Sequence, residues 1–142
     1  MGTDIHFVFQ AKSKRYDEWE DINSDLNCCF VFNTIPRDYA LFAWLAGVRN
    51  NSSINPISEP RGLPADFEVN GNYHTTDHGD HKILMGEHSY SWLLDDEIIN
   101  SKLPCYMDNI IDSEEDFTAF VNEVKRLKKI YGAVRFVFGF DS

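Results

Sequence analysis

The two ends of the chain carry the same pattern, in which large apolar residues alternate with polar or small ones. In residues 3–11 this alternation places Phe7 and Phe9 on one side of an extended chain, because every second side chain of a strand shares a face. Residues 133–140 alternate in the same way around Phe136. Two phenylalanine-rich strands at opposite ends of one chain predict a sheet in which they pair, with their phenylalanines facing a core.

The other face of the first strand is polar, with Asp4, His6 and Gln10 at alternate positions. If the terminal strands pair, Arg135 joins this face from the last strand. Burying a histidine and a carboxylate costs free energy unless each finds a hydrogen-bond partner. Nothing in the strand pattern requires these residues there. This face therefore predicts a site, although the pattern alone does not identify its chemistry.

The middle of the chain predicts a partner strand and a helix. Residues 18–22 alternate after a polar turn, which predicts a hairpin with the first strand. Pro36 at a first helical position and the spacing of Tyr39 and Phe42 predict a helix that ends near Gly47.

The clearest helical pattern in the sequence covers residues 113–131. A capping-box-like start at Ser113 is followed by an apolar stripe with the spacing of one helix face, and Gly132 supplies the stop. We expect this helix to pack on the core side of the sheet. The expected contacts join the phenylalanines of the two terminal strands to the helix stripe: Phe7, Phe9, Phe136 and Phe138 to Phe117, Phe120, Val124 or Leu127.

Residues 50–82 differ from the rest, because they are rich in proline, glycine, asparagine and serine and show little periodicity. They predict a long ordered loop or lid, and loops of this length in a compact domain are often functional. The predicted fold class is α+β. It comprises a mainly antiparallel sheet containing both terminal strands, at least two packed helices, and residues 50–92 covering one sheet face. A chain of 142 residues, 43% of them hydrophobic, predicts a single domain over residues 1–142.

The charge of the chain restricts its partners. A formal net charge of -10 repels phosphate backbones and anionic lipid, so direct nucleic-acid binding and membrane binding are not expected. An acidic surface presented to a basic partner is compatible with the same charge. No stretch of about 18 apolar residues and no signal-peptide pattern is visible. The three cysteines Cys28, Cys29 and Cys105 lack metal or redox spacing, which favours reduced thiols and a cytoplasmic location.

Histidines at positions 74, 78 and 81 have a spacing that would line one face of a helix and could suit zinc. Gly79 and the polar surroundings oppose a helix, and a solvated loop is the favoured interpretation. No metal or cofactor is predicted.

A second segment, His88 to Trp92, has two interpretations. It could be a turn into a helix that begins near Leu93, with Ser91 as the N-cap. The free backbone amides of that helix start would then form an anion site. Alternatively, its side chains belong to a ligand site.

Several segments together resemble a family of small proteins from tailed bacteriophages and bacteria. The resemblance runs from end to end and rests on residues 1–6 (MGTDIH), 37–49 (RDYALFAWLAGVR), 60–64 (PRGLP), 88–93 (HSYSWL) and 134–141 (VRFVFGFD). The resemblance implies a phage or bacterial origin for the protein, but it does not imply a particular reaction. Relatives often carry a glutamate where this chain has Gln10, which weakens any metal site that depends on a carboxylate there.

The polar face of the terminal strands and the matching segments together give a candidate ligand-binding set. Arginine forks grip phosphate or carboxylate, aromatic rings offer faces for a base, and histidine donates a hydrogen bond or moves a proton. Salt-bridged surface arginines are the alternative interpretation in so acidic a chain. No catalytic residue is assigned. The predicted ligand-binding residues are Asp4, His6, Arg37, Arg49, Arg61, His88, Ser89, Ser91, Trp92 and Arg135, expected in a single site.

This set is suited to a small anionic, nucleotide-like ligand. The phage resemblance implies a protein that sequesters such a ligand, for example an immune second messenger, in the host cytoplasm. One alternative is a small hydrolase or phosphodiesterase that uses His6 or His88 as base or metal ligand. Another is an acidic inhibitor of a host nucleic-acid-binding complex. The absence of a nucleophile motif favours a binder over an enzyme. Self-association and a host protein partner stay open.

Overall fold

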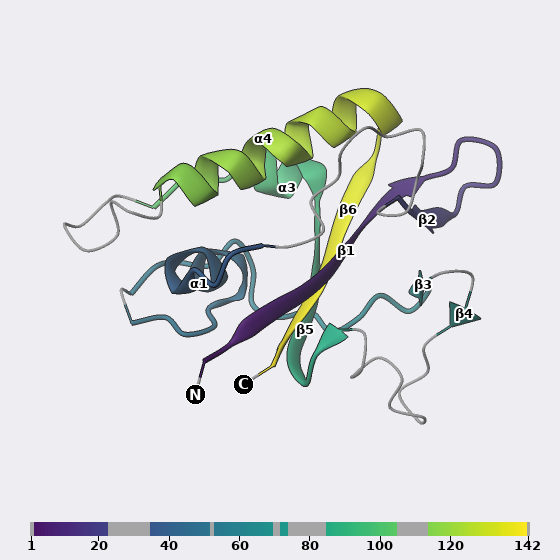
Figure 1. Cartoon of the computed structure of the whole chain (residues 1–142). Helices are drawn as coiled ribbons and strands as arrows, with labels where there is room; N and C mark the ends of the chain where they lie inside the picture. Colours follow the sequence, from purple (N-terminus) through teal and green to yellow (C-terminus); the bar gives the residue numbers. More distant parts are fainter. Residues whose placement is uncertain are drawn as a thin grey trace.

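The terminal strands lie at the centre of the protein. A computed structural model describes residues 2–22, 35–51, 53–69, 72–73, 85–104 and 114–141. Its main sheet is antiparallel with the strand order β2-β1-β6-β5 (Figure 1). The strands are β1 (Asp4–Lys12), β2 (Trp19–Asp21), β5 (His88–Leu94) and β6 (Val134–Asp141). The α+β class, the pairing of the terminal strands and the hairpin are therefore confirmed.

The register of β1 and β6 determines which side chains share each face of the sheet. Asp4 pairs with Asp141 at one end and Ala11 with Val134 at the other, so the two chain termini lie side by side (Figure 1). The phenylalanine face carries the odd positions of β1 and the even positions of β6. The mixed face carries the alternate positions, including His6, Gln10 and Arg135, as the sequence predicted.

Helix α1 (Tyr39–Ala46) begins at an aspartate. The Asp38 side chain accepts a hydrogen bond from the Leu41 amide at 3.1 Å, which satisfies a donor at the open helix start. The helix ends at Gly47, whose φ of 74° suits glycine, as predicted. The predicted start at Pro36 is wrong, because capping by Asp38 places the first helical residue three positions later.

Helix α4 (Glu114–Tyr131) covers the phenylalanine face (Figure 1). The Phe120 ring lies 6.4 Å from that of Phe9 and 5.0 Å from that of Phe136, which confirms the predicted helix-to-sheet contact. Helix α1 packs on the same face, with Phe42 5.2 Å from Phe140. Ser113, the predicted cap of α4, lies outside the described residues.

The interpretation of His88 to Trp92 as a turn into a helix capped by Ser91 is wrong. Residues 88–94 form strand β5, and the helix that follows, α3 (Asp95–Ile99), has only five residues. The alternation of Ser91 and Leu93 with Trp92 matches β6, where Trp92 pairs with Val137, so tertiary pairing determines the conformation. The Ser91 hydroxyl accepts a hydrogen bond from the Arg61 amide at 3.1 Å and caps no helix. The anion site inferred from a helix start there is therefore absent.

The region predicted as a loop covers part of the mixed face. Phe67 and Met85 pack on Val137 there, and the Gly62 amide donates to the Tyr90 carbonyl at the β5 edge. The region also contains a two-stranded sheet, β3 (Glu68–Val69) and β4 (Asn72–Tyr73). The covering region was predicted to extend to residue 92, which is wrong for residues 88–92, since β5 belongs to the main sheet. The histidines at 74, 78 and 81 and the three cysteines lie outside the described residues.

Within the described part of the chain, no helix combines the length and the apolar character needed to cross a bilayer.

Candidate functional site

The first candidate site lies where β1 begins and β6 ends. Arg37 donates to both oxygens of the Asp4 carboxylate, from Nε and Nη2, each at 2.9 Å. The Arg37 guanidinium therefore lowers the pKa of Asp4, and Asp4 raises the pKa of Arg37. Gly2 allows this geometry, because a Cβ at that position would lie 1.9 Å from Nη1 of Arg37. Both side chains are about half exposed, so solvent reaches the pair.

A histidine–aspartate pair lies beside it. Nε2 of His6 is 2.6 Å from Oδ2 of Asp141, and this hydrogen bond lowers the pKa of Asp141. Oδ1 of Asp141 accepts the Asp4 amide at 3.1 Å, which ties the two strands together at their ends. A carboxylate on Nε2 of the neutral ring leaves Nδ1 as the acceptor nitrogen.

A second arginine reaches the same strand start. Nε of Arg49 donates to the Thr3 hydroxyl at 2.8 Å, and its guanidinium lies 5.4 Å from the centre of the Tyr39 ring. The Tyr39 hydroxyl accepts the Thr3 amide at 3.1 Å. We call this group the terminal cluster: Thr3, Asp4, His6, Arg37, Tyr39, Arg49 and Asp141.

His88 lies outside the terminal cluster. It pairs with Phe140 in the register of β5 and β6, and its ring stacks on that of Phe140 at 6.3 Å, on the phenylalanine face. His6 lies on the mixed face, so the sheet separates the two histidines. Nδ1 of His88 is 2.9 Å from the Ser89 hydroxyl, and Ser89 has a φ of 57° within a bulge of β5.

Arg61 and Trp92 form a separate group at the β5 edge. The Arg61 guanidinium lies 4.6 Å from the centre of the Trp92 ring and binds both carboxylate oxygens of Glu97. It also donates to the Trp92 carbonyl at 3.0 Å. The ion pair lowers the pKa of Glu97 and raises that of Arg61. This arginine is engaged with the protein.

Arg135 lies on the mixed face at the opposite end of β1 from the terminal cluster. Nε donates to the Gln10 amide oxygen at 2.9 Å, and Nη1 donates to Asp66 at 3.1 Å. The guanidinium lies 4.7 Å from the centre of the Trp19 ring. Burial lowers the pKa of Arg135. Gln10 is itself fully buried and serves as an acceptor here.

The structure therefore distributes the ten predicted residues instead of gathering them. Asp4, His6, Arg37 and Arg49 share the terminal cluster. Ser91, Trp92 and Arg61 meet at the β5 edge, His88 and Ser89 lie beside Phe140, and Arg135 stands apart. The single-site arrangement is wrong, because strand register sets positions along the sheet that alternation cannot give. The alternative of salt-bridged arginines holds for Arg37 and Arg61. Ligand binding by any of the ten stays a prediction.

Sequence reasoning missed several partner residues. Asp141 lies in the last matching segment of the resemblance, which was the available signal for it. Trp19, Asp66 and Glu97 carried no signal, because only tertiary contact brings them to their arginines.

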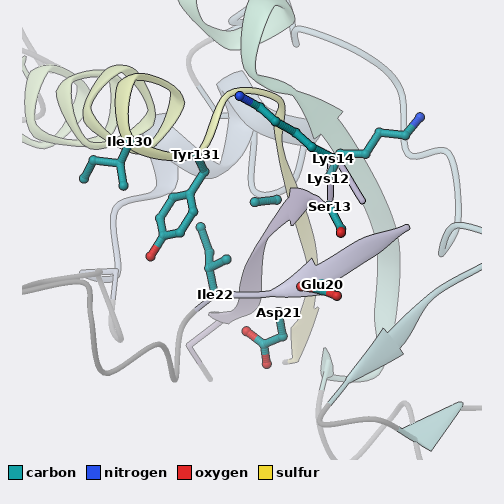
Figure 2. Close-up of a pocket in the computed structure, with 9 residues that line it drawn as sticks. Lys12, Ser13, Lys14, Glu20, Asp21, Ile22, Ile130 and Tyr131 are labelled. Carbon is teal, nitrogen blue, oxygen red and sulfur yellow. The ribbon is translucent and has the colours of Figure 1, made fainter. Parts of the chain in front are cut away.

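A pocket of about 540 Å³ opens between the β1–β2 hairpin and the last turn of α4 (Figure 2). In Figure 2 the Tyr131 ring and Ile22 lie on one side, and the Lys12 and Lys14 side chains leave the hairpin in different directions on the other. No residue of the predicted set lines it. The lining residues are Ala11, Lys12, Ser13, Lys14, Glu20, Asp21, Ile22, Ile130 and Tyr131.

Across the residues the structure describes, no group of three or more histidine, cysteine, aspartate or glutamate side chains could hold a metal ion. Comparison of the chain with protein-family models, curated proteins and solved structures gives no match.

Proposed function

We propose that the protein binds a small anionic ligand of nucleotide type at the terminal cluster. The observation that carries this proposal is the convergence of two arginines on the start of β1. Arg37 precedes α1 and Arg49 follows it, yet Arg37 binds Asp4 and Arg49 binds Thr3. Helix α1 thus brings two guanidinium groups to one strand end, with the Tyr39 ring between them in the sequence.

The chemistry of these groups suits a phosphorylated ligand. Guanidinium forks bind phosphate oxygens in pairs, and a tyrosine ring offers a face for a base. The Arg37–Asp4 pair is about half exposed, so a phosphate can compete with the carboxylate for the arginine at small cost. The overall charge of -10 opposes a long polyanion more than a small one, because a local pair of arginines offsets it.

The biological role follows from the resemblance to phage proteins. A phage protein that binds a nucleotide second messenger without turnover would lower its free concentration in the host cytoplasm. Sequestration of an immune signal is therefore the role we assign to the binding activity.

Hydrolysis of a nucleotide-like substrate is a second candidate, favoured by the His6–Asp141 pair. A carboxylate 2.6 Å from Nε2 holds the imidazole in one orientation, as in sites where histidine acts as general base through its other nitrogen. In a binding protein the same nitrogen, Nδ1, accepts a hydrogen bond from a hydroxyl or amino group of the ligand.

The test is binding followed by recovery of the ligand. Purified protein is mixed with mononucleotides, cyclic dinucleotides and ADP-ribose, its thermal unfolding is followed, and the released small molecule is analysed after denaturation. A hundredfold excess of ligand over Kd stabilises the native state by about 2.7 kcal/mol. We expect Arg37→Gln and Arg49→Gln to weaken binding by roughly tenfold or more, a loss of about 1.4 kcal/mol.

Arg15→Gln is the matched control, since Arg15 is an exposed arginine beside Tyr16 in the hairpin turn. Intact ligand in the released fraction supports sequestration. A cleaved product that disappears in His6→Asn establishes the hydrolase. Absence of binding to every nucleotide contradicts both sequestration and hydrolysis. The acidic inhibitor of a host protein is then the alternative that the result favours.

A further inference from the structure

Arg135 combines deep burial with an incomplete set of hydrogen bonds. Its side chain is only 5% exposed. Nε and Nη1 have partners, but Nη2 is buried and bonds to no described residue. Among the side chains that the structure describes, Nη2 of Arg135 is the one buried nitrogen or oxygen atom without a hydrogen-bond partner. Buried donors are almost always satisfied, so an unsatisfied one points to a missing partner.

The partners that Arg135 does have compensate its charge poorly. Gln10 is neutral, and Asp66 makes one contact while its own side chain is 60% exposed. A buried guanidinium is stable only when its charge and its donors are matched. The free donor therefore calls for an acceptor, preferably a negatively charged one.

A second cation approaches the same place. In the register of the hairpin, Trp19 lies opposite Lys12, and Nζ of Lys12 is 5.9 Å from the centre of the Trp19 ring. Arg135 lies 4.7 Å from the centre of that ring. The only described ion pair of Lys12 is with Asp17 at 3.3 Å, and both side chains are exposed, so this pair is weak.

We propose that a small oxyanion of the phosphate type binds here, accepting from Nη2 of Arg135 and paired with Lys12 beside Trp19. Asp66, which binds Arg135, and Asp21, which lies opposite Gln10 in the hairpin, limit the site to a small anion, and the Asp66 side chain is exposed, so it can turn outward. The site is distinct from the terminal cluster, because Arg135 lies opposite Gln10, six residues along β1 from Asp4, which is roughly 20 Å at the rise of an extended chain.

Nuclear magnetic resonance of the native protein tests the proposal. Inorganic phosphate is titrated while the indole N–H signals of the three tryptophans and the guanidinium Nε–H signal of Arg135 are followed. We expect saturable shifts at Trp19 and Arg135. Trp92 is an internal control, because it stacks on Arg61, whose guanidinium is bound to Glu97, Ser58 and a carbonyl. Sodium chloride at equal ionic strength controls for screening, and acetate distinguishes a carboxylate from a phosphate ligand.

The variants are matched in pairs. Lys12→Gln and Arg135→Lys are expected to weaken phosphate binding by about tenfold, since each removes a charge or a fork from the anion. Lys14→Gln, in the same hairpin turn, should leave it unchanged. If Arg135→Lys does not fold, Lys12→Gln and the wild-type titration still test whether phosphate binds at this site. The proposal is overturned if Trp19 shows no saturable shift, if Trp92 shifts equally, or if Lys12→Gln binds as well as wild type. A nucleotide-binding failure at the terminal cluster does not affect these outcomes.

Discussion

The two faces of the central sheet are covered by different kinds of contact. On the phenylalanine face, rings contact one another and two helices, and no polar group is required between them. The mixed face has an apolar centre around Val137, with His6 near one end and Arg135 near the other. Apolar packing is non-directional, whereas each polar group needs a partner at a defined distance. Stability is therefore concentrated on the phenylalanine face, and the candidate binding groups lie at the ends of the mixed face.

The largest effect that separates the faces is expected from two neighbouring residues of β6. Phe136→Ala removes a ring that contacts Phe9 and Phe120, and it should lower the free energy of unfolding by about 3–5 kcal/mol. Val137→Ala on the mixed face removes two carbon atoms and should cost about 1.5 kcal/mol. Urea unfolding measures both values. Equal losses would show that the mixed face contributes as much to stability as the phenylalanine face.

A smaller but still large effect is expected from Gly139, which marks the tightest contact of the mixed face. A Cβ added there would lie 2.1 Å from the Met85 carbonyl oxygen and 2.7 Å from the Tyr90 ring. Because the Met85 atom belongs to the backbone, it cannot turn away, and Gly139→Ala should destabilise the protein by about 2–3 kcal/mol. Gly132→Ala is a useful comparison, because its φ of 90° adds backbone strain in open space. A neutral Gly139→Ala in thermal unfolding would contradict the close approach of Met85.

The smallest expected effect is on the pH dependence of the free energy of unfolding, through a contact between the helices that cover the phenylalanine face. The Asp116 carboxyl group at the start of α4 hydrogen-bonds to Asp38, the cap of α1, and this contact raises the pKa of Asp116 to about 6. A folded-state pKa above the ordinary 3.8 gives stability that is complete below about 3.8 and is lost as the pH rises through about 6. Because Asp116 is partly exposed, the effect should stay below about 1 kcal/mol.

The change to test is Asp116→Asn, with unfolding measured at several pH values between 4 and 7. Removing the titrating group should flatten the decline in stability that wild type shows across this range. Asp4→Asn is the control from the mixed face. Arg37 lowers the pKa of Asp4, so its contribution is present above the ordinary value and is lost only in stronger acid. An unchanged pH profile in Asp116→Asn would rule out the Asp38–Asp116 contact as its source.

The elements were more predictable than their ends and partners. Alternation predicted β1 and β6, and helical spacing predicted α4, because these patterns reflect which side chains a local conformation exposes. The start of α1 was misplaced, since a proline and an aspartate cap both fit the sequence. Strand β5 was mistaken for a turn and a helix start, because its conformation depends on pairing with Val137 and not on local preference.

The sequence by itself determined that Asp4, His6 and Arg135 share one face of a sheet, because the period of an extended chain assigns a face to every position. Only the tertiary structure decided that His6 meets Asp141 at one end while Arg135 meets Gln10 and Asp66 at the other. It also decided that α1 brings Arg37 and Arg49 to the start of β1. Periodicity specifies direction, which is a local property of the backbone. Distance between residues far apart in the chain depends on register and on helix packing, which are set by the whole fold.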